Sequence, residues 1–257
     1  MKGEPMGDGK QLVVLNYHTI GTEKSDHYTV SSGRFREHLE IVLGKSWKSV
    51  SFDSLNQSGG DEARMAMWNF DDGTKDHYEV VSPILNEHGI KGVFYISTGK
   101  VGGEKYVTGS QIAEMAKAGH EMECHGHRHQ RMDVMSPAEL RDELARSLDH
   151  LEEWSGRRPV TLAPPGGFLN GMVLEEARRA GLCFVRTMRW GLNAYPPNFE
   201  IRCQVVTGRT SLRQYEDRLA GKGVWKQECL YHGKQALRSV LPAKFYLGLR
   251  KLVSGSK

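Results

Sequence analysis

The chain has 257 residues, of which 39% are hydrophobic and 26% charged, and its formal net charge at pH 7 is +4. This composition is typical of a globular protein with a sizeable core, and it excludes a chain that is disordered throughout. The basic residues are scattered along the sequence, which argues against a groove for nucleic acid.

Short apolar runs rich in β-branched residues alternate with amphipathic segments along nearly the whole chain. This pattern is typical of β/α repeats around a parallel sheet. The predicted strands are 11–17, 64–70, 91–97, 120–125, 159–163, 182–187, 201–206 and 228–232. The predicted helices are 33–43, 75–88, 136–156 and 170–180. Eight strand candidates with helices between them favour a single-domain α/β barrel over an open sheet.

The helix predicted at 136–156 has the clearest local signals. Ser136 is expected to cap it, Pro137 takes the first helical position, and Glu139 completes a capping box. Gly156 is expected to end it. Its apolar stripe consists of Leu140, Leu144, Leu148 and Leu151.

The two ends of the sequence carry predictions about location. The N-terminal residues contain a short apolar run without a cleavage pattern, and no run approaches the roughly 20 apolar residues that cross a bilayer. As written, the sequence predicts a cytoplasmic protein without a transmembrane segment, which meets its substrate inside the cell or at the inner face of the membrane. Residues 233–257 are expected to form a helical extension, for which packing against the barrel is favoured over contact with an anionic membrane.

Four cysteines are widely separated and form no Cys-x-x-Cys pair. They are Cys124, Cys183, Cys203 and Cys229. We expect buried free thiols.

Chemistry-bearing residues follow the predicted strands at the points where the strands end. In β/α barrels, functional residues collect at the carboxyl ends of the strands. The strand-end residues here are Tyr17, His18, Asp71, Asp72, 125–129, 164–167, 186–190 and His232. This placement predicts one site rather than a series of independent turns.

The sequence ECHGHRHQRM contains three closely spaced histidines, His125, His127 and His129. A pair of histidines four residues apart can present two imidazole nitrogens to one ion. A carboxylate from Asp71 or Asp72 would complete a set of ligands that both zinc hydrolases and non-haem iron enzymes use. The alternative is a solvated histidine cluster without a specific ligand.

Five short motifs, in order, carry a resemblance to a known family. They are FDDG at 70–73, His-x-x-x-His at 125–129, Pro-Pro-x-Gly at 164–167, a tryptophan at 190 and Leu-x-His at 230–232. In these motifs the chain resembles the polysaccharide deacetylase family, the NodB-homology domain of carbohydrate esterase family 4, as a divergent bacterial subgroup. The segment LNYHTIG at 15–21 is similar to one found in many bacterial members. The resemblance covers about residues 12–232.

The resemblance implies a distorted (β/α) barrel with about seven parallel strands. It also implies the removal of N-acetyl groups from amino sugars with the help of one divalent ion. Zinc is the expected metal, with cobalt, nickel, iron and manganese as alternatives. Carried over by position, the metal ligands would be Asp72, His125 and His129, whereas His127 occupies a variable position.

The other roles are carried over in the same way. Asp71 would be the general base and His232 the general acid. Backbone N–H groups of the loop that contains Pro165 and Gly166 would stabilise the oxyanion. The predicted wall of the acetyl pocket is Trp190 and Leu230.

Elementary physics fits two adjacent aspartates with different tasks. Neighbouring side chains at a strand end point in different directions, so Asp72 can bind an ion while Asp71 stays available as a base. The charge of the ion keeps both carboxylates ionised despite their mutual repulsion.

Four positions depart from the family pattern, one of them Asn69, where threonine is common. Ala163 stands where the family has an arginine that orients the base, and Arg189 stands where an aspartate is usual. Either Arg189 or Arg186 is therefore expected to orient Asp71. Gly126 replaces the usual serine or threonine after the first histidine.

These observations predict hydrolysis of a non-peptide amide bond, namely N-deacetylation of an amino sugar in a bacterial polysaccharide or its precursor. One alternative is a deformylase or other amide hydrolase that acts on a lipid-linked or small-molecule substrate. A second is a non-catalytic domain that holds a metal and binds glycan. An iron oxygenase is disfavoured, because the sequence offers no obvious site for a cosubstrate.

Overall fold

The computed structural model describes residues 9–21, 27–57, 63–225, 228–229 and 233. The predicted site residues Leu230 and His232 lie outside the described residues. Residues 234–257 of the predicted C-terminal extension also lie outside them, and so does the prediction about membrane contact. Within the described residues, every helix is too short or too polar to cross a bilayer.

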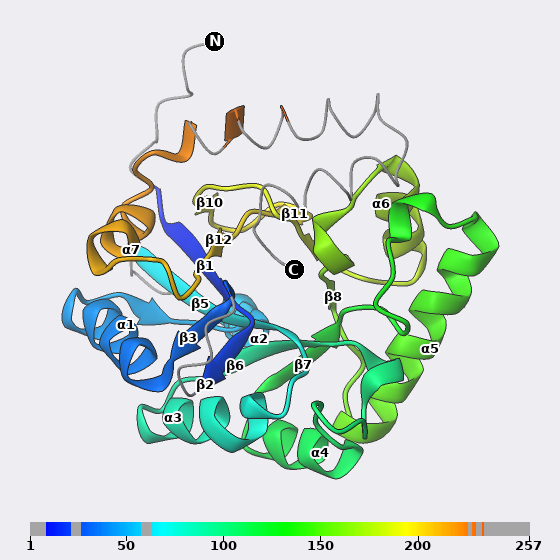
Figure 1. The fold of residues 1–257 in the computed structure, drawn as a ribbon. Helices are drawn as coiled ribbons and strands as arrows, with labels where there is room; N and C mark the ends of the chain where they lie inside the picture. The colour runs from blue at the N-terminus through cyan, green and yellow to red at the C-terminus, as the bar shows by residue number, and fades with distance from the viewer. Residues whose placement is uncertain (1–8, 22–26, 58–62, 226–227, 230–232, 234–257) are drawn as a thin grey trace.

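One nearly closed sheet forms the centre of the molecule (Figure 1). Its parallel strands lie in the spatial order β1, β5, β6, β7, β8, β9 and β11. Their bounds are Gln11–Tyr17, Arg64–Asp72, Gly92–Ile96, Glu121–Cys124, Thr161–Leu162, Phe184–Arg186 and Glu200–Ile201. Strand β12 (Gln204–Val205) follows β11 closely and pairs in parallel with β1, which brings the two edges together. The predicted distorted barrel with about seven parallel strands is confirmed.

Short strands and helices complete the architecture. Strand β10 (Asn193–Ala194) pairs antiparallel with β1, β4 (Lys48–Ser49) pairs with β5, and β2 (Thr19–Gly21) pairs with β3 (Thr29–Ser31). The α-helices are α1 (Ser32–Gly44), α2 (Phe52–Gln57), α3 (Ser82–Glu87), α4 (Gly109–Lys117), α5 (Pro137–Ser155), α6 (Gly171–Arg179) and α7 (Leu212–Leu219). They lie around the sheet, except α2, which lies behind its centre in Figure 1. Shorter helical turns are η1 (His77–Val81), η2 (Thr98–Lys100), η3 (Met132–Val134) and η4 (Pro165–Gly167).

The local signals for helix α5 are confirmed. Ser136 accepts the backbone N–H of Glu139, and the Glu139 side chain accepts the N–H of Ser136 in return, so the capping box is complete. Gly156 ends the helix in the left-handed conformation that glycine adopts without steric cost. The four predicted leucines are all buried. Leu140, Leu144 and Leu148 belong to a cluster with residues of β8 and α6, whereas Leu151 belongs to the cluster that includes Ile112 and Met115 of α4.

Three predicted elements differ in the structure. The helix predicted at 75–88 consists of a short π-helix, η1, followed by the short α-helix α3. Pro83 has no N–H to donate to the preceding turn, which interrupts the regular α-helical hydrogen bonds. The strand predicted at 201–206 is divided into β11 and β12. The N–H of Arg202 bonds to the Asn193 side chain and that of Cys203 to the Arg189 carbonyl, so these two residues do not continue a strand ladder. The described part of the strand predicted at 228–232 is helical, since β10 and β12 already cover the free edge of β1.

The expectation of buried free thiols is correct in part. All four cysteines are free, and Cys124 and Cys203 are buried. Cys183 and Cys229 are exposed, so the prediction is wrong for them. Leu182 and Val185 fill the core beside Cys183, which leaves the thiol on the solvent side.

The side chains of β5 alternate between two apolar regions. Trp68 and Phe70 pack outward against Phe35 of α1. Met65 and Met67 belong to a separate cluster inside the barrel. Because side chains alternate along a strand, Asp71 continues the inward series, and it is only 3% exposed. The same alternation therefore places a carboxylate inside the carboxyl end of the barrel.

Candidate active site

Three potential metal ligands meet at the carboxyl end of the barrel. Asp72 ends β5, whereas His125 and His129 belong to the loop after β7. Asp72 Oδ1 lies 2.7 Å from His129 Nε2 and 3.4 Å from His125 Nε2. One ligand atom from each residue lies within 4.8 Å of the other two. A tetrahedral ion needs this kind of convergence of two imidazoles and a carboxylate.

The backbone is strained at two of these residues. Asp72 has a φ of 81° and His129 a φ of 57°, which is the left-handed region that non-glycine residues rarely adopt. Such a conformation costs about 1–3 kcal/mol per residue and persists only where surrounding contacts impose it. The side chains of these two residues meet in the ligand group.

The hydrogen bond of His125 defines which ring nitrogen can bind a metal. His125 Nδ1 lies 2.6 Å from the carbonyl oxygen of Ala163, and because a carbonyl only accepts, Nδ1 carries the proton. The lone pair is then on Nε2, which faces Asp72. Histidine ligands are commonly oriented by such a bond on the far nitrogen. The donor set therefore fits a divalent ion that accepts nitrogen and oxygen ligands.

Asp72 is ionised within this group. Burial opposes ionisation, but the imidazoles of His125 and His129 outweigh it where they carry a proton on Nε2, and the pKa of Asp72 then lies below its ordinary value. The charge of a bound divalent ion would take the place of those protons. An ionised carboxylate is the form that binds a metal.

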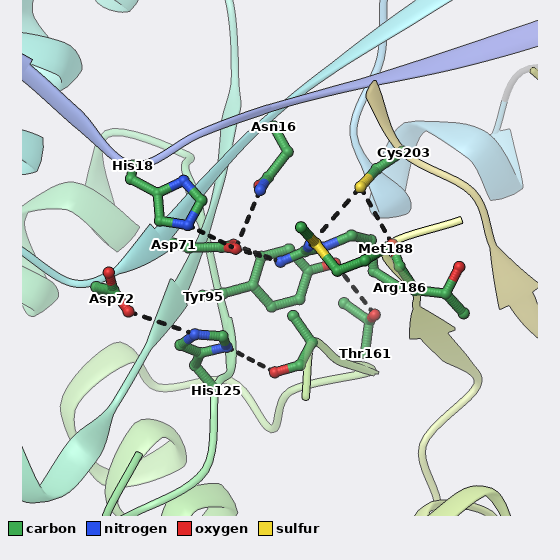
Figure 2. Close-up of polar contacts among 12 residues, drawn as sticks. Asn16, His18, Asp71, Asp72, Tyr95, His125, Thr161, Arg186, Met188 and Cys203 are labelled. Atoms are coloured by element: carbon green, nitrogen blue, oxygen red, sulfur yellow. Dashed lines mark hydrogen bonds and ion pairs between the residues drawn. The ribbon is translucent and has the colours of Figure 1, made fainter. Parts of the chain in front are cut away.

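Asp71 is fixed by an arginine and an asparagine (Figure 2). Arg186 Nη2 lies 2.5 Å from Oδ1 and 2.6 Å from Oδ2, and Asn16 Nδ2 donates to Oδ2 at 3.1 Å. Burial would raise the pKa of Asp71, but the charge of Arg186 outweighs it and lowers the pKa. The carboxylate is thus ionised and has a defined orientation.

Arg186 and Arg189, the two candidates for orienting Asp71, lie in different surroundings. Arg186 ends β9 and is only 2% exposed, whereas Arg189 Nη2 contacts Glu228 at 3.2 Å. The guanidinium of Arg186 lies over the ring of Tyr95, with Met188 Sδ 3.3 Å from Nη1. The geometry therefore places Arg186, rather than Arg189, against Asp71.

His18 is a member of this group that the motifs did not assign. It follows β1, and its Nε2 lies 3.9 Å from Asp71 Oδ2 (Figure 2). Burial lowers the pKa of His18, although the charges of Asp71 and Asp72 act in the opposite direction. The ring of His18 also packs on Tyr28, with the ring centroids 4.7 Å apart. The signal in the sequence was its position after a strand, in LNYHTIG.

The residues after the Asp-Asp-Gly turn hold the backbone around His18. Asp76 Oδ2 accepts the N–H of Ile20 at 2.7 Å, and His77 Nε2 donates to the carbonyl oxygen of His18 at 2.6 Å. His77 is 1% exposed, so its bond is shielded from water. The π-helix η1 therefore links β5 to the end of β1.

Other predicted site residues lie as follows. His127 is directed to Thr98, with Nδ1 3.0 Å from Oγ1, and it packs beside His150. Trp190 is partly buried against the interior cluster, with Arg218 over its ring. Thus His127 bonds away from the group formed by Asp72 and its two histidines.

The loop of Pro165 and Gly166 forms the turn η4 after β8. Gly166 has a φ of 65°, and Gly167 donates its N–H to Pro164 at 2.9 Å. Since prolines have no N–H, the amide of Gly166 is the group in this turn that could face a ligand. Its role in binding an oxyanion stays a prediction.

The chain is similar in sequence to known proteins. A family model described as "Polysaccharide deacetylase" matches residues 58–185. YxkH of Bacillus subtilis is 23% identical over 175 residues, which are 66% of this chain and 62% of YxkH. A peptidoglycan-N-acetylglucosamine deacetylase of Bacillus cereus is 26% identical over 128 residues, which are 49% of this chain and 56% of that protein. The chain thus covers less than two thirds of either relative.

Two solved structures have a similar fold. The deacetylase PplD of Streptococcus pyogenes, solved in complex with acetate, is 20% identical with a TM-score of 0.74, over 82% of this chain and 99% of that one. IcaB of Ammonifex degensii is 22% identical with a TM-score of 0.69, over 82% of this chain and 97% of that one. At these identities the likeness shows a shared fold.

Proposed function

The chain belongs to the polysaccharide deacetylase family, and from this premise we propose that it is a zinc-dependent hydrolase that removes the N-acetyl group from an amino sugar of a glycan or its precursor. The observation that carries the proposal is the arrangement of the two adjacent aspartates. Asp72 lies against His125 and His129, while Asp71 is held separately by Arg186.

Asp72, His125 and His129 would hold the ion. A bound divalent ion supplies Lewis-acid chemistry, because it polarises an amide carbonyl and lowers the pKa of water. Zinc suits a set of two imidazoles and one carboxylate, and it needs no redox partner.

Asp71 would act as the general base. Its carboxylate is ionised, and Arg186 and Asn16 fix its orientation. It takes one proton from the attacking water, whose oxygen forms the new bond to the acyl carbon. The C–N bond then breaks, and the products are a carboxylic acid and an amine.

His18 is placed to return that proton to the leaving nitrogen. Its Nε2 lies 3.9 Å from Asp71 Oδ2, beyond direct hydrogen-bond distance, so the proton collected by Asp71 would reach the imidazole through one water. The assignment of this role to His232 stays a prediction, because His232 lies outside the described residues. Matched His18→Asn and His232→Asn variants separate the two, since loss of the general acid costs about 10²–10⁴-fold in kcat.

The test of the function is acyl release by the purified, zinc-loaded chain. Acetate and formate are measured with a panel of N-acetylated and N-formylated sugars and lipid-linked precursors, with and without a chelator. We expect acetate release that a chelator abolishes and added zinc restores. Activity that is insensitive to the chelator would contradict the mechanism, and the absence of any acyl release would favour a glycan-binding domain.

A further inference from the structure

The loop that carries the two metal-ligating histidines is bonded to a carboxylate on helix α5. Glu143 is completely buried. Its Oε1 accepts the backbone N–H of His127 at 2.8 Å and that of Arg128 at 2.6 Å. Its Oε2 accepts Nε of Arg128 at 2.7 Å. One side chain therefore holds two consecutive N–H groups between His125 and His129.

The opposite side of the same loop is bonded to the turn η2. Thr98 donates its N–H to the carbonyl oxygen of Gly126 at 3.2 Å, and Gly99 donates to that of His127 at 2.8 Å. The loop is thus fixed through its carbonyl groups by η2 and through its N–H groups by Glu143. Such bonds on both sides can impose the left-handed backbone conformation of His129, two residues after His127.

Gly126 makes room for the carboxylate. Its φ is 75°, and a Cβ there would lie 2.7 Å from Met132 Cε and 3.0 Å from Glu143 Oε1. A serine or threonine at this position would therefore push against the group that binds the next two N–H groups. The unusual glycine and the buried glutamate are parts of one arrangement.

The contact with the Arg128 side chain does not by itself explain why a glutamate is buried at position 143. That side chain is 44% exposed, and an ion pair with an exposed partner contributes little to stability. A buried carboxylate is costly unless it is hydrogen-bonded, and here two of its three donors are backbone groups of the loop.

We propose that Glu143 is a positioning residue for the metal site: it fixes the backbone between His125 and His129 so that both Nε2 atoms face Asp72. The inference rests on the metal site of the proposed function but not on hydrolysis. It predicts that loss of Glu143 weakens metal binding even when the fold is retained.

The test compares Glu143→Leu with Glu176→Leu. Glu176 is a matched control, because it is a glutamate on the neighbouring helix α6, 3% exposed, and it pairs with Arg141 and Arg179. The dissociation constant for zinc is measured by competition with a chelating dye, below the unfolding temperature of each variant. We expect Glu143→Leu to weaken zinc binding about 100-fold, the upper end of the range for groups that orient ligands. We expect Glu176→Leu to change it less than about twofold, since the contacts of Glu176 are with Arg141 and Arg179 and not with the histidine loop.

Two further variants keep the proposal testable if Glu143→Leu does not fold. Glu143→Gln keeps the shape but loses the charge and one acceptor, and we expect about 10-fold weaker zinc binding. Arg128→Ala keeps both backbone bonds to Oε1, and we expect zinc binding close to that of the wild type. The proposal would be overturned if Glu143→Gln bound zinc as tightly as the wild type. It would also be overturned if Arg128→Ala and Glu143→Gln lost the same amount of zinc affinity. Because zinc affinity is measured without substrate, these results do not depend on whether the protein hydrolyses amides.

Discussion

Strand β7 has a buried histidine at each end, and the two are bonded differently. His120 precedes the strand, and both of its ring nitrogens are used: Nδ1 accepts the N–H of Gly92 at 3.1 Å, and Nε2 lies 2.9 Å from Ser82 Oγ. His125 follows the strand and bonds through Nδ1 to Ala163, whereas Nε2 faces Asp72. The first histidine is satisfied by the fold itself, while the second has an atom directed at other potential ligands.

The carboxylates of the two barrel ends differ in the same way. Glu121 and Glu123 of β7 are nearly completely buried and accept backbone N–H groups at the amino ends of neighbouring elements. Asp72 instead meets two imidazoles on a strained backbone. Burial alone therefore does not mark a functional group. What distinguishes Asp72 is that it meets other potential ligands instead of backbone groups.

Replacing each histidine separately gives the strongest test of this comparison. We expect His125→Ala to weaken zinc binding by more than about 100-fold, because removal of a ligand exceeds the loss of a group that only orients one. His120→Ala should keep zinc affinity and lose only stability. Competition titration with a chelating dye measures both. Equal zinc affinities in the two variants would remove the distinction between the ends of β7.

Asp71→Asn tests the division of labour between the adjacent aspartates. We expect kcat to fall about 10²–10⁴-fold, since an amide cannot take the proton of the attacking water. Zinc content should remain that of the wild type, because Asp72 and both histidines are unchanged. Initial rates of acetate release and metal analysis of the same sample provide the measurement. A variant that keeps full turnover would exclude Asp71 as the base.

The two arginines near the site should differ in their effect on stability. We expect Arg186→Ala to lower the free energy of unfolding by about 3–5 kcal/mol, because it leaves the Asp71 carboxylate buried and unpaired. Arg189→Ala removes a partly exposed contact with Glu228 and should cost no more than about 1 kcal/mol. Urea unfolding of both variants measures the difference. The interpretation fails if Arg189→Ala is the more destabilising of the two.

His120, at the amino end of β7, should make the stability of the protein depend on pH. Burial, with a further contribution from the charge of Lys91, lowers the pKa of His120 to about 4. The folded value is below that of the unfolded chain, so the unfolded chain binds more protons between these two values, and the free energy of unfolding falls as the pH decreases. From pH 7 to pH 5 the contribution of His120 is about 2 kcal/mol.

His120→Gln isolates this contribution. Glutamine can still accept and donate hydrogen bonds but does not titrate in this range, so the variant should lose less stability than the wild type between pH 7 and pH 5. The comparison with the wild type is needed because burial also lowers the pKa of His38, to about 3, in the same direction. Parallel pH profiles of the two proteins would contradict the assignment.

The sequence was most informative where the signal is local. The caps and leucine stripe of α5 depend on residues within a few turns of one another, and the strand-end histidines follow from one short segment. The division of 201–206 between β11 and β12 could not be read in this way, because it depends on hydrogen bonds to Arg189 and Asn193 in an earlier segment. The exposure of Cys183 similarly depends on which neighbours reach the core.

The sequence by itself determined the fold class and the group formed by Asp72, His125 and His129, because alternating hydrophobic runs and short motifs carry both. Only the tertiary structure decided that Arg186 rather than Arg189 contacts Asp71, that His18 lies beside Asp71, and that Glu143 accepts a backbone N–H of the histidine loop. Arg186 and Asp71 are 115 positions apart, and Asn16 lies 55 positions before Asp71. No local pattern specifies such contacts, because they arise when the barrel brings the ends of separate strands into one interior.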